Sequence, residues 1–280
     1  MTGLARSTYY YKRKTDSDKK LKNDMELRDA IERIHLTFPG YGYRRLYKYF
    51  LRQGKRINGK RIKRIMKTYE LYTCLKKFMK PRGTHSEVKI VYPNLVAGMN
   101  LTGRNQVWAS DITYIRLLRE FVYLVAIIDI YTRKIVGWAL SRNLSHKFCL
   151  EALEVAIRKE KPPSGIIHHS DRGVQYVCED YVKVLLKNNF KVSMSNTGTP
   201  DENAFIEAFF KTLKREEVYF RDYKIMDDVL KNLPNFIDEL YNKKRMHSSL
   251  GYQSPEEFEE MVLNLKPADR PTQKIWGKTV

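Results

Sequence analysis

The sequence predicts an α/β fold, a five-stranded mixed sheet with flanking helices, preceded by a small all-α domain. Three observations lead to this prediction. Apolar residues recur at helical spacing in the first 75 residues. After residue 103, short runs rich in Val, Ile, Tyr and Trp alternate with helical segments, an order typical of α/β domains. The charge is also divided, because residues 1–90 hold 25 Lys and Arg against 8 Asp and Glu, or +17 of the total +20.

The composition is that of a globular protein of about two domains. Hydrophobic residues make up 42% of the chain, yet no run approaches the roughly 18 apolar residues of a membrane span, and no apolar secretory segment is visible, so we expect no membrane. The cysteines Cys74, Cys149 and Cys178 lack the paired spacing of a zinc site. We therefore expect reduced, mostly buried thiols in a cytoplasmic protein.

An extension over residues 1–22 is expected to precede a three-helix domain at 23–75. The first helix carries apolar residues from Met25 to Leu36 on one face, and Asn58 is a candidate N-cap for the third. Proline and glycine residues separate the helices. The predicted helices cover 25–36, 43–51 and 60–71.

The third helix places Ile62, Ile65 and Met66 inward and its basic residues outward. Three short helices with a basic last one resemble a helix-turn-helix, whose last helix lies against a DNA groove. The alternative is an ordinary three-helix unit with a solvated basic face. The candidate DNA-binding residues here are Arg44, Arg45, Lys60, Arg61, Lys63, Arg64 and Lys67.

Residues 76–102 contain two prolines and two glycines without periodicity, which indicates a linker. A core domain at 103–222 and a C-terminal helical region and tail at 223–280 follow. A capping box at Thr199–Glu202 is expected to open the last core helix, which extends to about Tyr219. The predicted order agrees with a ribonuclease-H-like sheet, although order alone does not separate it from other α/β folds. We predict strands at 106–115, 121–130, 135–140, 166–168 and 191–194, and helices at 145–160 and 178–188.

Three carboxylates fall at matching places in this pattern. Asp111 interrupts a strand, where a buried carboxylate needs a partner such as a cation. Asp171 follows a short strand, and Glu207 lies two turns into the last core helix. Hard oxygen ligands suit Mg²⁺ or Mn²⁺, and two such ions can activate an attacking hydroxyl or water and stabilise the leaving oxygen. We expect these three residues to be catalytic and to hold two metal ions.

Several neighbours are candidates for supporting roles. Lys211 and Lys214 share the helix face of Glu207 and are expected to contact DNA phosphates, and Gln175 is a further candidate contact. Asn203 and His169 are candidates for hydrogen bonding to the ligands from outside, although a neutral, structurally bonded histidine is an alternative. For Asp129 two interpretations stay open, because it either supports the metal ligands or caps the following turn. Arg245 and His247 are candidates either for DNA contact or for a structural motif.

The spacing of 35 residues between Asp171 and Glu207 resembles the Asp-Asp-35-Glu signature of retroviral-type integrases and related transposases. The sequence segments around these residues resemble those of the OrfB-type proteins of the IS-three family of bacterial insertion sequences. One departure is Glu202, where the family usually has Asp; Glu keeps the charge. The matching segments are Trp108–Ile115, His169–Tyr176, Ser193–Ser195, Asn203–Glu216 and Tyr241–Pro255, with Gly42–Arg45 and Lys60–Met66 in the helix-turn-helix.

The resemblance implies a DNA transposase that cuts and joins the ends of an insertion sequence with Mg²⁺, for which Mn²⁺ substitutes. It implies double-stranded DNA as partner, both terminal repeats and target, a homo-oligomer on that DNA, a 3′-hydroxyl as the joining group and a circular intermediate. It further implies an upstream-frame protein, or a frameshift fusion with it, because residues 3–11 look like the tail of another helix-turn-helix. The expected location is the bacterial cytoplasm, on the nucleoid.

Two other functions are compatible with the residues. One is a non-catalytic DNA-binding regulator of the element, and the other is a structure-selective nuclease of the same fold. The intact set of carboxylates favours the enzyme over a decayed copy.

Overall fold

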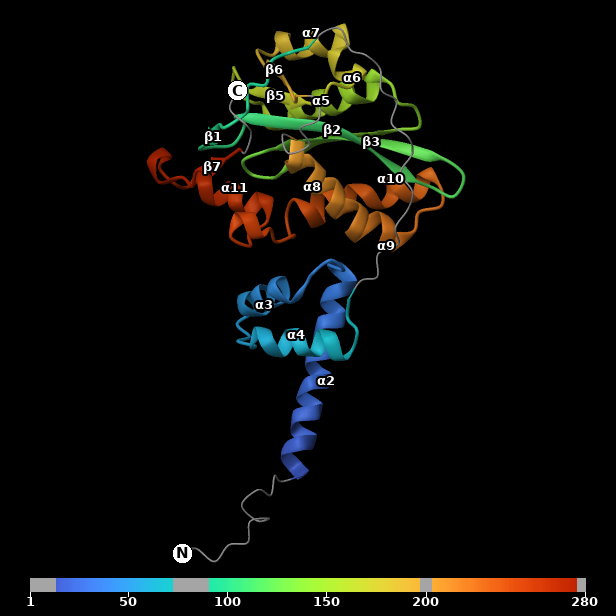
Figure 1. The fold of residues 1–280 in the computed structure, drawn as a ribbon, viewed down its shortest axis with the longest axis vertical. Coiled ribbons are helices and arrows are strands. Elements are labelled where there is room, and N and C mark those ends of the chain that lie inside the picture. The colour runs from blue at the N-terminus through green and yellow to red at the C-terminus, as the bar shows by residue number, and fades with distance from the viewer. Residues whose placement is uncertain (1–13, 73–90, 197–202, 276–280) are drawn as a thin grey trace, which may run out of the picture. The chain divides into compact units, whose positions relative to one another are not determined.

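A computed structural model describes residues 14–72, 91–196 and 203–275 (Figure 1). The chain divides into two compact units, Met1–Leu75 and Lys76–Val280, each of which is described by itself. The segment 3–11 and the predicted capping box at 199–202 lie outside the described residues. Within the described ranges, no helix combines the length and apolar composition needed to cross a bilayer.

The first unit contains three helices, α2 (Lys14–Thr37), α3 (Tyr43–Arg52) and α4 (Gly59–Thr68). The predicted cap is confirmed, because the Asn58 side chain accepts a hydrogen bond of 2.8 Å from the Lys60 N–H. Ile62, Ile65 and Met66 are buried as predicted. Helix α4 ends three residues before the predicted Leu71, since Glu70 adopts a left-handed backbone conformation with φ of 50°.

The apolar face predicted for the first helix is partly wrong. Met25 and Leu36 are 44% and 77% exposed. The buried face consists of Leu27, Ile31 and Ile34, which are four and three residues apart and therefore stack on one side of the helix. Met25 and Leu36 lie two positions outside this series, about 200° around the helix axis. The helix also begins at Lys14, inside the segment expected to be an extension.

The second unit is built on the five-stranded mixed sheet that the sequence predicts. Strands β2 (Val107–Arg116), β3 (Phe121–Asp129) and β4 (Ile135–Ser141) are antiparallel, whereas β5 (Ile167–Ser170) runs parallel to β2, and β6 (Lys191–Met194) runs parallel to β5. The strand order is β4-β3-β2-β5-β6. The boundary of each strand lies within two residues of its predicted position.

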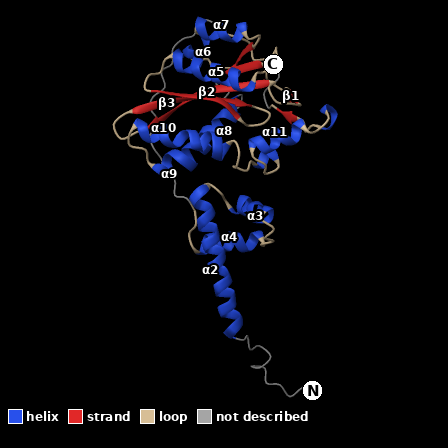
Figure 2. Ribbon diagram, turned by 180° about the vertical axis from the view of Figure 1, so that it is seen from behind, coloured by secondary structure: helices blue, strands red, loops and turns tan. Residues whose placement is uncertain are grey.

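Helices cover both faces of this sheet, as Figures 1 and 2 show. On one face lie α5 (His146–Glu160), the short α6 (Val174–Val177) and α7 (Glu179–Lys187), which share a hydrophobic cluster with Trp108 and Val125. On the other face lie α8 (Ala204–Leu213), α10 (Met226–Pro234) and α11 (Pro255–Leu263), packed around Ala109 and Leu124.

Helix α8 continues through a π-helical stretch, η2 (Lys214–Val218), into α9 (Tyr219–Arg221). The predicted long helix is therefore real, but its regular hydrogen bonding changes after Leu213. The chain also forms η3 (Asn235–Tyr241), η4 (Ser248–Leu250) and η5 (Pro267–Asp269).

The end of the predicted linker packs against the second unit. Strand β1 (Asn100–Leu101) pairs antiparallel with β7 (Gln273–Lys274), and Val96 and Leu101 are buried. The Leu95 N–H also donates to the Ser193 hydroxyl at 2.9 Å. Local sequence cannot indicate this pairing, because the two strands are more than 170 residues apart.

Candidate functional site

The sheet places two of the three predicted carboxylates next to each other. Strands β2 and β5 run parallel with Ser110 beside Ser170, so that Asp111 and Asp171 are neighbours one residue further along. Asp111 also pairs with Ala126 of β3, which puts it on the sheet face covered by α8. The parallel register therefore brings together carboxylates 60 residues apart in sequence.

The electrostatics of the pair reflect this proximity. Burial, followed by the charge of Asp171 and more weakly that of Glu207, raises the pKa of Asp111 to about 8. Burial also raises the pKa of Asp171, although this side chain still reaches solvent. Each carboxylate accepts one backbone hydrogen bond, from Ile112 at 2.7 Å and from Gly173 at 2.9 Å respectively. Two carboxylates held this way repel each other unless a cation or a proton reduces their charge.

Glu207 enters the same site from helix α8. Its side chain is 37% exposed, and its Oε2 atom accepts from the Lys211 ammonium at 3.2 Å. The three carboxylates are not drawn into one tight cluster. Among the described residues, the one group of three potential ligands whose donor atoms all lie within 4.8 Å is instead His146, Cys178 and Asp180. Glu207 is therefore close enough for its charge to raise the pKa of Asp111, while its own Oε2 atom is paired with Lys211.

Lys214 supplies positive charge to this site. Its ammonium lies 4.2 Å from the centre of the Tyr114 ring, and its charge lowers the pKa of Asp111. Tyr114 lies on β2 three residues beyond Asp111. The predicted lysine thus lies against the part of β2 that follows Asp111, near enough for its charge to affect this carboxylate.

Gln175 is positioned by its neighbour Tyr176. The Tyr176 ring is 1% exposed, and its hydroxyl accepts from the Ser110 hydroxyl at 3.1 Å. This bond ties α6 to the strand residue that precedes Asp111. Tyr176 is therefore a core residue, whereas Gln175 beside it is partly exposed.

Both histidines before Asp171 are buried in the sheet. His168 shares a hydrogen bond of 2.9 Å with the Tyr181 hydroxyl, and burial lowers its pKa to about 3, which keeps the ring neutral. His169 shares one of 2.9 Å with the Ser193 hydroxyl. The structure therefore agrees with the alternative interpretation, in which these histidines form hydrogen bonds inside the protein.

Of the two interpretations left open for Asp129, the structure shows the turn cap. Its oxygens accept from the Thr132 N–H at 2.7 Å and from the Asn105 N–H at 2.6 Å. Asp129 pairs with Trp108, which faces the α5 side of the sheet, whereas Asp111 faces the α8 side. Residues three positions apart on a strand point to opposite faces, which separates the two carboxylates.

Asn203 lies directly before α8, with a side chain 6% exposed. Its Oδ1 atom is buried and has no hydrogen-bond partner within the described part of the chain. A buried amide oxygen without a donor is costly, so this atom is available to a water or another donor at the start of the Glu207 helix.

In the first unit, two of the predicted DNA-binding residues form ion pairs with one acidic residue. Arg61 and Arg64 donate to Asp24 of α2 at 3.0 and 2.7 Å. Burial of Asp24 opposes its charged form, but the hydrogen bonds from Arg64 and Arg61 outweigh it and lower the pKa of this carboxyl. The outward face of α4 is basic as predicted, with exposed side chains of Lys60, Lys63, Arg64 and Lys67, while α3 contributes exposed Arg44 and half-buried Arg45.

Of the two interpretations of Arg245, DNA contact or a structural role, the structure shows the structural role. Its guanidinium donates two hydrogen bonds of 2.7 Å to Glu216, and both side chains are at most 5% exposed. The neighbouring Asn242 side chain accepts from the Ile135 N–H at 2.9 Å and donates to the Ile135 carbonyl at 3.0 Å. These residues fasten the C-terminal segment to η2 and to the first residue of β4.

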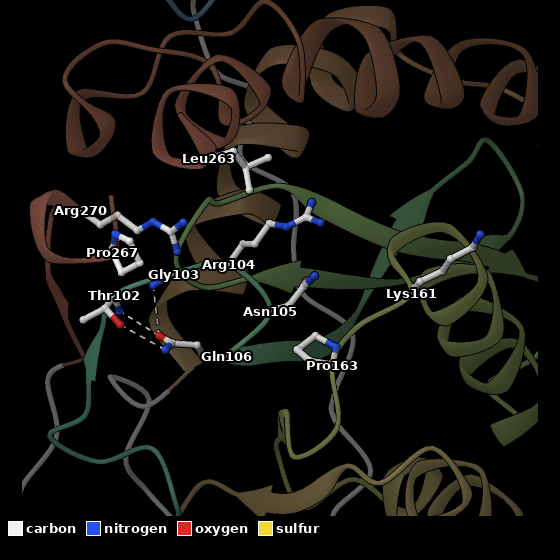
Figure 3. A pocket seen from close by; sticks show the side chains of 10 residues that line it. All are labelled: Thr102, Gly103, Arg104, Asn105, Gln106, Lys161, Pro163, Leu263, Pro267 and Arg270. Atoms are coloured by element: carbon white, nitrogen blue, oxygen red, sulfur yellow. Dashed lines mark hydrogen bonds between the residues drawn. The ribbon is translucent and has the colours of Figure 1, made fainter. Parts of the chain in front are cut away.

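A pocket of about 420 Å³ is lined by none of the three carboxylates, and Figure 3 shows the residues that do line it. It is lined by residues 102–106, just before β2, and by Lys161 and Arg270. Arg104 in its wall pairs with Glu259 at 2.6 Å. The pocket is at the end of the sheet where β2 begins, whereas Asp171 follows the end of the parallel strand β5. It is therefore separate from the carboxylate site.

Comparison with known proteins connects both units to known families. An integrase core domain family matches residues 102–200, a second integrase core family matches 188–255, and an HTH-like domain family matches 22–77. The chain is 34% identical to the insertion element IS600 uncharacterized 31 kDa protein of Shigella sonnei, over 92% of this chain and 96% of that protein. It is also 34% identical to the transposase for insertion sequence element IS904 of Lactococcus lactis, over 85% and 96%.

Other matches cover less or are more distant. The transposase InsF for IS3A of Escherichia coli is 37% identical over 58% of this chain and 56% of that protein. The HTLV-2 integrase catalytic core domain in complex with magnesium aligns with 59% of this chain and 99% of its own, at 12% identity and a TM-score of 0.44. A chain of the simian T-cell lymphotropic virus intasome aligns over 85% and 79%, at 14% identity and a TM-score of 0.47.

Proposed function

This chain belongs to the insertion-sequence transposases that carry an integrase core domain, and we propose that its Asp111, Asp171 and Glu207 perform the metal-dependent cutting and joining of DNA. The observation that carries the assignment is the parallel register of β2 and β5, which makes Asp111 and Asp171 neighbours. The charge of Glu207 acts on the same site from α8.

The donor atoms fit a hard divalent cation. All three side chains offer carboxylate oxygens, which Mg²⁺ and Mn²⁺ prefer. The pKa of Asp111 is raised to about 8 by burial and by the neighbouring carboxylates, so the site carries more negative charge than the protein alone stabilises. Two Mg²⁺ ions, or Mn²⁺ in their place, would supply the positive charge that stabilises the attacking and leaving oxygens of a phosphodiester.

The residues of the chain position the reactants. Asp111 lies in β2 and Asp171 directly follows the adjacent strand β5, so the backbone hydrogen bonds between Val107–Ser110 and Ile167–Ser170 hold the two carboxylates near each other. Glu207 would hold a metal ion in place of its present bond with Lys211, which would leave the Lys211 ammonium for a DNA phosphate. Lys214 stays beside Asp111 and adds positive charge for the scissile phosphate. Gln175, held near the site by Tyr176 and Ser110, contacts the substrate strand, and the unpaired Asn203 oxygen accepts a bond from a water next to Glu207.

The first unit binds double-stranded DNA through the basic face of α4 and through Arg44 and Arg45 of α3. The ion pairs with Asp24 use one carboxylate oxygen each, so Arg61 and Arg64 keep further N–H groups for phosphates. We assign terminal repeats and target DNA as the substrates, a homo-oligomer as the form that joins two ends, and the upstream-frame protein, or a fusion with it, as a partner. The location is the bacterial cytoplasm, on the nucleoid.

A cleavage and joining assay tests the proposal. It uses DNA carrying the element's own ends with Mg²⁺ or Mn²⁺, and compares this chain, its fusion to the upstream frame, and Glu207→Gln in each. We expect metal-dependent cleavage and joining that disappear in Glu207→Gln. Glu151→Gln, an exposed Glu on α5, is the matched control and keeps activity.

Two results would contradict the proposal. Undiminished activity of Glu207→Gln would remove Glu207 from the mechanism. Binding of the ends without any cutting by the fused protein would favour the second function, a non-catalytic regulator that occupies the element's ends.

A further inference from the structure

A second group of potential metal ligands lies outside the carboxylate site. His146 is the first residue of α5, Cys178 joins α6 to α7, and Asp180 is in the first turn of α7. One donor atom from each lies within 4.8 Å of the other two. The His146 Nε2 and Asp180 Oδ2 atoms are 3.6 Å apart. All three side chains reach solvent, so an ion in solution has access to them.

We propose that His146, Cys178 and Asp180 bind a divalent transition-metal ion of the Zn²⁺ class. One imidazole nitrogen, one thiolate and one carboxylate oxygen are the ligand types that Zn²⁺ takes in proteins. Two N or O ligands of a tetrahedral zinc ion lie about 3.4 Å apart, since each bond is about 2.1 Å long. The observed 3.6 Å is therefore close to the separation that a shared ion imposes.

The donor set distinguishes this site from the carboxylate site. A thiolate is a soft ligand that Mg²⁺ does not select, whereas three carboxylates suit Mg²⁺. Three protein ligands leave the fourth position of a tetrahedral ion for water. The sequence offers no hint of this site, because its single cysteine is 32 residues away from the histidine and lacks a paired cysteine.

The position of the site suggests a structural effect on the catalytic segment. Helix α6 connects the loop after Asp171 to Cys178, and Tyr176 in this helix bonds to Ser110. An ion that joins α5 to the start of α7 would restrain the C-terminal end of α6 at Cys178, and through this short helix the segment that follows Asp171. This link to catalysis rests on the proposed function, whereas binding of the ion does not.

Cobalt spectroscopy tests the site directly. The full chain is titrated with Co²⁺ in excess Mg²⁺, which fills oxygen-only sites without competing for a thiolate. We expect one equivalent of Co²⁺ to produce the visible bands of a tetrahedral ion and a near-ultraviolet thiolate charge-transfer band, and Zn²⁺ to remove both.

The variants separate this site from the other thiols. Cys178→Ala should lose the charge-transfer band completely, and His146→Ala, at a partly exposed position, should weaken binding strongly without affecting the fold. Cys149→Ala and Cys74→Ala are the matched controls and should keep the band; Cys149 is buried, and burial raises its pKa to about 12.

The proposal is overturned if no charge-transfer band forms, or if the band survives in Cys178→Ala. His146 and Asp180 then form only a side-chain contact beside a free thiol. The cleavage assay with Glu207→Gln gives an independent result, so failure of this site and failure of the proposed function are distinguishable.

Discussion

The buried ion pair between Glu216 and Arg245 leads to a quantitative prediction. Two charge-assisted hydrogen bonds of 2.7 Å join the side chains, which are at most 5% exposed. Replacing Arg245 by Met leaves the Glu216 carboxylate buried without its partner. Breaking such a pair costs about 3–5 kcal/mol in the free energy of unfolding, because the remaining charge stays desolvated.

For a domain of this size, about 2–4 °C is lost per kcal/mol, so we expect the midpoint of thermal unfolding to fall by about 6–20 °C. The three tryptophans, Trp108, Trp138 and Trp276, all belong to the second unit, and their fluorescence therefore reports its unfolding separately from that of the first.

The double variant Glu216→Met with Arg245→Met is the decisive control. Two apolar side chains of similar length fill the same space without a buried charge, so the double variant should recover most of the lost stability. If the double variant is no more stable than Arg245→Met, the loss comes from packing and the reasoning is refuted. If Arg245→Met unfolds like the parent but binds DNA weakly, Arg245 is a DNA contact instead.

Three further changes test other parts of the structure. Because the folded-state pKa of Asp111 is raised to about 8, stability of the metal-free protein should fall as pH rises from about 4 to about 8. Asp111→Asn should reduce this dependence, and the remainder belongs to Asp129 and Asp171, whose pKa values burial also raises. The full pKa shift of Asp111 corresponds to about 6 kcal/mol, but this side chain is half-buried and partly screened by solvent. We therefore expect Asp111→Asn to be about 1–3 kcal/mol more stable than the parent at pH 8, measured by urea unfolding with a chelator. Equal stability of parent and variant at pH 8 would contradict this. Asp24→Asn should destabilise the first unit by about 1–2 kcal/mol, since both arginine partners are partly exposed, and faster hydrogen exchange of α4 amides measures it; unchanged exchange would mean that the ion pairs contribute nothing. Gly137→Ala should destabilise the second unit by about 1–3 kcal/mol in tryptophan-monitored unfolding, because a Cβ there collides with the Ala152 carbonyl and lies 2.8 Å from the Ala156 Cβ; a neutral effect would mean that α5 shifts away freely.

Much of the fold could be predicted from the sequence because local patterns determine the local elements. Strand runs such as Val107–Arg116 have the composition that favours a pleated, buried backbone, and the interior strands were predicted to within two residues. The Asn58 cap was predictable because it depends on a hydrogen bond two residues away. Prediction failed where an element's end is decided by a backbone conformation, as at Glu70.

The candidate site, too, could be predicted from the sequence only in part. The sequence predicts a set of three catalytic carboxylates, Asp111, Asp171 and Glu207, from their places in the α/β pattern, and their catalytic role stays a prediction. It does not decide what each polar residue contacts. Asp129 is as polar and as strand-bound as Asp111, yet it points to the opposite face and caps a turn.

The sequence by itself determined the order of the elements and the basic first unit, because both depend on neighbours within a few positions, and it offered Asp111, Asp171 and Glu207 as candidate ligands. Only the tertiary structure decided which distant residues meet. The register of β2 with β5 joins Asp111 to Asp171, the packing of α2 on α4 engages Arg61 and Arg64 with Asp24, and that of α5 on α7 gathers His146, Cys178 and Asp180. The physical reason is that hydrogen bonds and ion pairs act over a few ångströms in space, whereas sequence patterns report only separations along the chain.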